Sequence, residues 1–214
     1  MLCFCCGGRA FASAKAEDKA HPKGLPAIGK WMLETVPELG PARWVGIPFK
    51  GKRLIEPINI ILVDKYAASE EDAVKRLIAS CVLAGYEQRS GHASGYKACI
   101  DGIFYGQLPE KENHAFSNAP SEFNNNRGRI FGPRYKEGAY YFIGAFSRER
   151  IIPLEQSQHR YVSFTQARDD FAKKFEQDTH YKISGRIRLN NVLQTKEEAT
   201  GDHDGFAVLL SAQR

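Results

Sequence analysis

Two histidines are the residues of this chain whose surroundings could support catalysis. His114 lies in the segment 113–118, NHAFSN, where a neighbouring hydroxyl or amide could help it act as a general base. His159 precedes a predicted helix and would reach Asp169 or Asp170 only if the turn folds back. His114 has no carboxylate at a local spacing, and the two acids are explained by the helix dipole. Both histidines are therefore weak catalytic candidates.

Four arginines form two i, i+2 pairs that could capture an anion. Arg127 and Arg129 alternate onto one face of a predicted strand, and Arg186 and Arg188 do the same on another. Guanidinium groups bind phosphate or carboxylate through paired hydrogen bonds. The structural alternative is a solvated sheet face whose charges discourage edge pairing. If the two strands are neighbours, the four arginines would form one basic, anion-binding surface.

The histidine spacing gives no indication of a metal site. The six histidines, at positions 21, 92, 114, 159, 180 and 203, show no i, i+4 or His-x-His grouping, whereas zinc needs three or four converging ligands. The chain also lacks a phosphate-cradling Gly-rich loop and a nucleophile elbow. We therefore expect neither a metal nor a cofactor.

The charge distribution limits the classes of partner that this protein is expected to bind. A net charge of +5 over 214 residues is mildly basic, and acidic residues are interleaved with the basic ones. Nucleic-acid binders cluster their Lys and Arg residues, so no nucleic-acid partner is expected. No run of about 18 apolar residues is present, so no transmembrane segment is expected in the mature chain. An anionic lipid, an envelope polymer or a membrane protein remains as a possible partner.

Residues 1–14 resemble the end of a secretory signal peptide. Ala12-Ser13-Ala14 fits a small-residue cleavage site, and cleavage after Ala16 is a second option. The segment lacks a basic start, so we expect the true start codon upstream. The three cysteines in it follow no lipobox, so no lipid anchor is expected. These features predict a periplasmic or secreted protein; the alternative is an unstructured N-terminus on a cytoplasmic one.

Cleavage at this site would leave two cysteines, Cys81 and Cys99. One remaining pair in an exported protein predicts a single disulfide. The alternative is that Cys81 is a core thiol, since it lies on the apolar face of a predicted helix and free cysteine is often buried.

The elements that must position these residues follow from the apolar pattern. Residues 15–55 are predicted to form a lead-in with a short helix at 28–36, ahead of a single domain at 56–214. Helices are predicted after the N-caps Ser69 and Ser163, the second with a capping box to Gln166. Strands are predicted near 58–63, 102–107, 126–131, 138–147, 181–189 and 206–210, with turns at 124–126 and 132–133. The order β-α-β-β-β-α-β-β predicts an α+β fold: a mainly antiparallel sheet with two principal helices packed on it.

The same elements resemble the C-terminal domain of LssY over roughly residues 56–175. The resemblance rests on PINIILVD at 57–64, LAGY at 83–86, IFYG at 103–106, HAF at 114–116, RGRIF at 127–131, YFIGAF at 141–146, HRY at 159–161 and QARDD at 166–170. The chain departs from the family at His114, where the family has another residue type, and at Arg160, where a second histidine is expected. The resemblance implies the fold and a context near bacterial membrane proteins, and it implies no reaction.

Two functions are compatible with these features. The first is a binding or accessory module at the bacterial envelope that works without a cofactor. The second is a hydrolase of a phosphate or acyl substrate that uses His114 with Arg127 and Arg129. An enzyme should bring these side chains into one concave site, whereas a binding module could leave them scattered over a surface.

Overall fold

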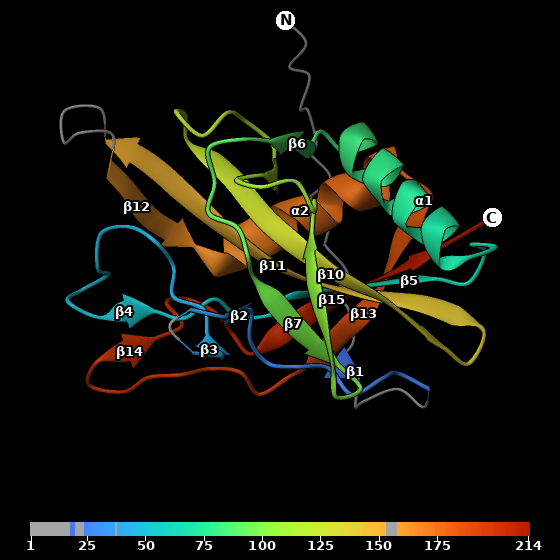
Figure 1. Ribbon diagram of the computed structural model, residues 1–214, viewed down its shortest axis with the longest axis horizontal. Coiled ribbons are helices and arrows are strands. Elements are labelled where there is room, and N and C mark those ends of the chain that lie inside the picture. Colours follow the sequence, from blue (N-terminus) through green and yellow to red (C-terminus); the bar gives the residue numbers. More distant parts are fainter. Residues whose placement is uncertain (1–17, 20–23, 37, 153–157) are drawn as a thin grey trace, which may run out of the picture.

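The fold is known from a computed structural model, which describes residues 18–19, 24–36, 38–152 and 158–214 (Figure 1). The predicted signal segment, residues 1–14, lies outside the described residues.

Two helices and fifteen strands make up the described part of the chain. The helices are α1 (Glu70–Leu83) and α2 (Phe164–Asp178). The strands are β1 (Asp18–Lys19), β2 (Leu33–Glu34), β3 (Gly40–Pro41), β4 (Arg53–Leu54), β5 (Ile60–Asp64), β6 (Glu87–Arg89), β7 (Lys97–Ile100), β8 (Ile103–Leu108), β9 (Ala115–Ser117), β10 (Asn125–Lys136), β11 (Ala139–Ile152), β12 (Gln158–Ser163), β13 (Tyr181–Arg188), β14 (Glu198–Ala199) and β15 (Phe206–Ala212).

Thirteen of these strands form one sheet, whose main path runs β1-β13-β15-β5-β11-β10-β8-β7-β2-β3. Strands β1 and β13 are parallel, as are β15 and β5, and the other pairs in this sheet are antiparallel. β12 pairs with β11, so β10, β11 and β12 form a continuous antiparallel surface. The predicted α+β class is confirmed: the protein combines two helices with a large, mostly antiparallel sheet.

Both helices begin at the predicted caps. The Ser69 hydroxyl oxygen accepts a hydrogen bond from the Asp72 backbone N–H at 3.1 Å, and the Ser163 hydroxyl oxygen accepts one from the Gln166 N–H at 2.8 Å. Each bond satisfies a backbone donor that the first helical turn leaves unpaired. After α1, Gly85 adopts a φ of +74°, a conformation that glycine takes readily.

The two faces of the sheet bury different sets of apolar side chains. One face of the sheet packs against α1 and α2 (Figure 1). Phe142 and Phe146 of β11 lie there in one apolar cluster with Leu77 of α1 and Phe171 of α2. The opposite face packs against the N-terminal segment and β7; Met32, Ile100, Phe131, Ile143 and Leu209 lie there. Alternation along β10 and β11 sends neighbouring side chains to opposite faces. Residues 25–55 are thus integrated into the core rather than forming a separate lead-in.

Three local predictions were wrong. Residues 28–36 form no helix, because their backbone pairs with other segments: Ile28 bridges Ile100, and Leu33 in β2 pairs with Lys97. Gly132 and Pro133 do not end a strand, since β10 continues through them with a register shift between Phe131 and Arg134. The helices are separated by seven strands rather than three, because several short strands carried too little apolar pattern to be recognised.

Candidate functional site

Glu149 of β11 is the centre of a charged group on the sheet face away from the helices. Its Oε2 accepts a hydrogen bond from Arg127 Nε at 2.9 Å and lies 3.0 Å from Nδ1 of His159. Its Oε1 accepts a hydrogen bond from Asn125 Nδ2 at 3.0 Å. Burial alone would raise the pKa of Glu149, but Arg127 and His159 outweigh it and lower the pKa to about 2. The carboxylate is therefore ionised at neutral pH.

Strand register explains why these side chains meet. Asn125 of β10 lies opposite Glu149 of β11, and Arg127 lies opposite Ser147. Because side chains alternate along a strand, Asn125, Arg127 and Arg129 share one face of β10. On the other side of β11, the antiparallel strand β12 supplies His159.

Arg129 lies deeper than Arg127. Its side chain is among the largest fully buried ones, with 1% of the residue exposed. One Nη donates a hydrogen bond to Ala93 O at 2.6 Å, and the guanidinium lies over the Tyr96 ring, 5.0 Å from its centre. Its Nε has no hydrogen-bond partner among the described residues. Burial and then the charge of Arg127 lower the pKa of Arg129 to about 10, so it stays a cation at pH 7.

His92 covers the two arginines from the loop between β6 and β7. The residue is 4% exposed, and neither ring nitrogen has a hydrogen-bond partner in the described part of the chain. Burial, followed by the charges of Arg127 and Arg129, lowers its pKa to about 4, so the ring is neutral at pH 7. Gly91 and Gly95, both with positive φ, flank this part of the loop. A neutral buried imidazole with two unused nitrogens is a costly arrangement.

Glu56 completes the group. It is buried, and burial raises the pKa of its carboxyl group, although the nearby charges of Arg127 and Arg129 oppose this effect. We call Glu56, His92, Arg127, Arg129, Glu149 and His159 the buried charged cluster. The two guanidinium groups of Arg127 and Arg129 therefore lie near two carboxyl groups, those of Glu56 and Glu149.

The buried charged cluster reaches solvent on one side. Exposure of the side chains rises from 0% for Glu149 to 5% for Arg127 and 33% for His159. The accessible side is therefore that of β12, and Arg129 and His92 lie behind it.

Of the two histidines predicted as weak catalytic candidates, one lies in the buried charged cluster and the other lies elsewhere. His159 belongs to the cluster, where it pairs with Glu149 rather than with Asp169 or Asp170. His114 lies on an exposed turn, and its Nδ1 is 2.7 Å from the Glu112 carbonyl oxygen. None of the described contacts joins His114 to Arg127 or Arg129. Sequence reasoning missed Glu56, His92 and Glu149, because all three lie outside the helices and strands that it predicted.

The prediction of a single basic surface was also wrong. Arg186 and Arg188 lie opposite Val208 and Phe206 of β15, on the helix side of the sheet. Arg127 and Arg129 lie on the other face, and β15, β5 and β11 separate their strand from β13. Spacing along each strand correctly paired the arginines, but it carries no information on which face each pair occupies.

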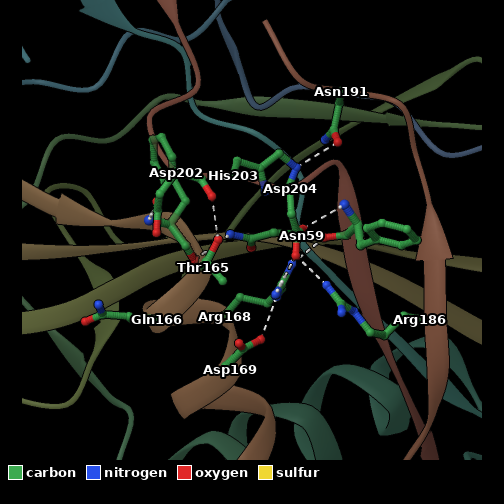
Figure 2. Close-up of polar contacts among 12 residues, drawn as sticks. Asn59, Thr165, Gln166, Arg168, Asp169, Arg186, Asn191, Asp202, His203 and Asp204 are labelled. Carbon is green, nitrogen blue, oxygen red and sulfur yellow. Dashed lines mark hydrogen bonds and ion pairs between the residues drawn. The ribbon is translucent and has the colours of Figure 1, made fainter. Parts of the chain in front are cut away.

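Arg186 instead joins a second polar network at the start of α2 (Figure 2). Arg168 donates to both carboxylate oxygens of Asp204, at 2.6 and 3.2 Å, and Arg186 also pairs with Asp204. Burial opposes the ionisation of Asp204, but Arg168 outweighs it and lowers the pKa to about 2.

The neighbouring Asp202 holds the N-terminus of α2. It accepts hydrogen bonds from the Tyr161 and Ser163 hydroxyls and from the Phe164 N–H, the last at 2.8 Å. Both carboxylates of this second network have several donors, and these contacts join the β14–β15 connection to α2. We therefore assign this network to stabilising the fold.

The predicted disulfide between Cys81 and Cys99 is absent, and both thiols are free. Cys81 is buried on the helix side of the sheet with Leu77. Cys99 lies on β7, which covers the opposite face through Ala98 and Ile100. The sheet separates the two residues, so the core-thiol alternative describes Cys81.

In the described residues, no group of three or more His, Cys, Asp and Glu side chains is placed to hold a metal ion. No described helix has both the length and the apolar character needed to cross a membrane. Comparison of the chain with protein-family models, with curated proteins and with solved structures finds no match. The candidate site therefore rests on its own geometry.

Proposed function

We propose that this protein is a binding module that takes a small anionic group, a carboxylate or a phosphate, at the buried charged cluster. The observation that carries the proposal is the unused hydrogen-bonding capacity around Arg129. Its Nε and both nitrogens of His92 are buried without described partners, and they belong to neighbouring groups. A ligand oxygen could accept from Arg129 Nε and from the one N–H of the neutral His92 ring.

Electrostatics favour the same class of ligand. A buried charge is stable only when it is paired and hydrogen-bonded. Glu149 pairs directly with Arg127, while no ion pair of Arg129 with a described residue is present. An oxyanion next to Arg129 would accept a hydrogen bond from its unpaired Nε and pair with the guanidinium charge.

The cellular setting is part of the proposal and rests on the sequence alone. The signal-like residues 1–14 and the resemblance to the LssY C-terminal domain support an exported protein at the bacterial envelope. There the anionic group could belong to a lipid, to an envelope polymer or to a membrane-protein partner. A cytoplasmic location is the alternative.

The test is calorimetric titration of the full chain with adipate and with inorganic phosphate at low salt. We expect saturable binding of at least one anion by the wild type and at least about a 10-fold loss in Arg129→Gln, which removes the deepest positive charge. Arg53→Gln is the matched control, because Arg53 is half-exposed on β4 and lies outside the cluster. Its affinity should equal that of the wild type.

Two results would overturn the proposal: no binding of either anion by the wild type at about 10 mM, or equal affinity in Arg129→Gln. If Arg129→Gln fails to fold, as judged by circular dichroism, His92→Gln replaces it. That variant keeps both guanidinium charges, and we expect weaker binding because its side chain cannot reproduce the imidazole geometry.

A further inference from the structure

His159 and Glu149 have the arrangement of a histidine held by a carboxylate. The Glu149 carboxylate can only accept a hydrogen bond, so the Nδ1 that lies 3.0 Å away carries the proton. The other ring nitrogen, Nε2, is then an acceptor with a free lone pair. Glu149 thereby fixes both the tautomer and the orientation of the ring, as the carboxylate does in a catalytic triad.

Water can reach this histidine. The His159 side chain is 33% exposed, whereas Glu149 beneath it is fully buried. None of the described hydrogen bonds uses Nε2 of His159. The imidazole therefore lies on the accessible side of the cluster, with a nitrogen that no described residue occupies.

The same carboxylate oxygen also fixes the distance between the histidine and the anion site. Oε2 of Glu149 accepts a hydrogen bond from Arg127 Nε at 2.9 Å and lies 3.0 Å from His159 Nδ1. The two side chains are thus neighbours around a single atom. A ligand whose anionic end pairs with Arg127 would therefore have His159 as its neighbour on the exposed side of the cluster.

We propose that the protein hydrolyses acyl esters whose acyl chain carries a free anionic group, with His159 as the general base. This inference rests on the proposed anion site. The His159 Nε2 takes a proton from water while the water oxygen attacks the ester carbonyl carbon. The carbonyl electrons move to oxygen, and the resulting oxyanion lies near the charge of Arg127. When the carbonyl reforms, the C–O bond to the alcohol breaks, and the imidazolium returns the proton to the leaving oxygen.

The products are a free acid and an alcohol, and no other reactant is consumed. His159 is the catalytic residue in this scheme, and Glu149 is a positioning residue that acts through it. General-base catalysis of this kind typically contributes about 100- to 10,000-fold in rate.

The experiment compares two chromogenic esters of equal chain length, mono-4-nitrophenyl adipate and 4-nitrophenyl hexanoate. We expect kcat/KM to be at least about 10-fold higher for the anionic ester, because only that ester can use the arginines. His159→Gln should lower kcat by about 100-fold or more. His114→Gln, a substitution on an exposed turn, is the matched control and should retain the full rate.

Binding of adipate is measured on the same variants, so that the two proposals can fail separately. His159→Gln should still bind adipate saturably, because Arg127 and Arg129 are unchanged. Adipate binding without hydrolysis by the wild type would overturn this inference and leave the proposed function intact. Retained hydrolysis in His159→Gln, or no preference for the anionic ester, would also overturn it. Absence of both binding and hydrolysis would overturn both proposals.

The Glu149→Gln variant tests whether Glu149 orients His159 for catalysis or only stabilises the fold. If the variant folds, kcat should fall by a larger factor than the adipate affinity, because the amide no longer holds the His159 ring as the carboxylate does. An unchanged kcat would contradict the positioning role. If Glu149→Gln does not fold, the His159→Gln comparison decides the matter.

Discussion

Asn59 and Phe146 exchange two hydrogen bonds in the core of the sheet. The Asn59 side-chain amide donates to Phe146 O at 2.9 Å, and Phe146 N donates to Asn59 Oδ1 at 3.0 Å. Asn59 directly precedes β5, which pairs with β11 as far as Gly144. The side chain therefore completes the ladder at the point where the backbone of β5 no longer can.

This exchange predicts a large effect of Asn59→Ala. The substitution would leave a buried N–H and a buried C=O without their partner, and each such group costs about 1 to 3 kcal/mol. We expect the free energy of unfolding to fall by roughly 3 kcal/mol in urea denaturation. Gln88→Ala, at an exposed position of β6, should change it by less than about 0.5 kcal/mol. Equal stabilities of the two variants would contradict this role of Asn59.

The buried histidines predict a loss of stability in mild acid. Burial lowers the pKa values of both His92 and His203 to about 4, below the value of about 6.5 in an unfolded chain. Between these values the unfolded chain binds more protons, so stability is full above pH 6.5 and is lost as the pH falls toward 4.

From pH 7 to pH 5 the loss should be on the order of 1 to 2 kcal/mol per histidine. Urea denaturation at the two pH values measures it. His92→Gln should lose less stability than the wild type over this interval, because one of the two histidines is removed. His92 also faces Arg127, Arg129, Glu149 and His159, so His203→Gln serves as an independent comparison. If neither variant reduces the pH dependence, the protonation of these two histidines is not its cause.

The free thiols predict a difference in alkylation. Cys99 is partly exposed, whereas Cys81 is buried in the core between the sheet and the helices. Iodoacetamide should modify Cys99 in the native protein and Cys81 only after unfolding, since burial raises the pKa of the Cys81 thiol and shields it. Peptide mass mapping without reductant distinguishes the two. Detection of a peptide pair linked through Cys81 and Cys99 would show that the disulfide forms and would contradict the free thiols.

The sequence was most informative where a local interaction determines the structure. Ser69 and Ser163 begin the helices as predicted, because an N-cap needs only a side chain and a backbone N–H three residues apart. The strands near 58–63 and 181–189 were recognised from the apolar pattern within each segment, which is also local information. The turn prediction at Gly132 and Pro133 failed, because pairing along β10 and β11 outweighed two residues that favour turns.

The candidate site was predictable only in part. Strand alternation correctly placed Arg127 and Arg129 on one face. Their burial depends on a loop that brings His92 from 35 positions before Arg127 and on a third strand that brings His159. Such contacts join distant segments, and residue spacing within one element does not contain them. Glu149 was overlooked because the strand predicted near 138–147 stopped short of it, whereas β11 continues to Ile152.

Strand β15 has a consequence for how the protein can be made. It lies between β13 and β5 in the middle of the sheet, yet it is the last strand of the described chain. A nascent chain that has emerged from the ribosome only as far as β13 lacks the strand that connects β13 to β5. The sheet can therefore become continuous only after residues 206–212 have left the exit tunnel, and its final assembly must follow the synthesis of this segment.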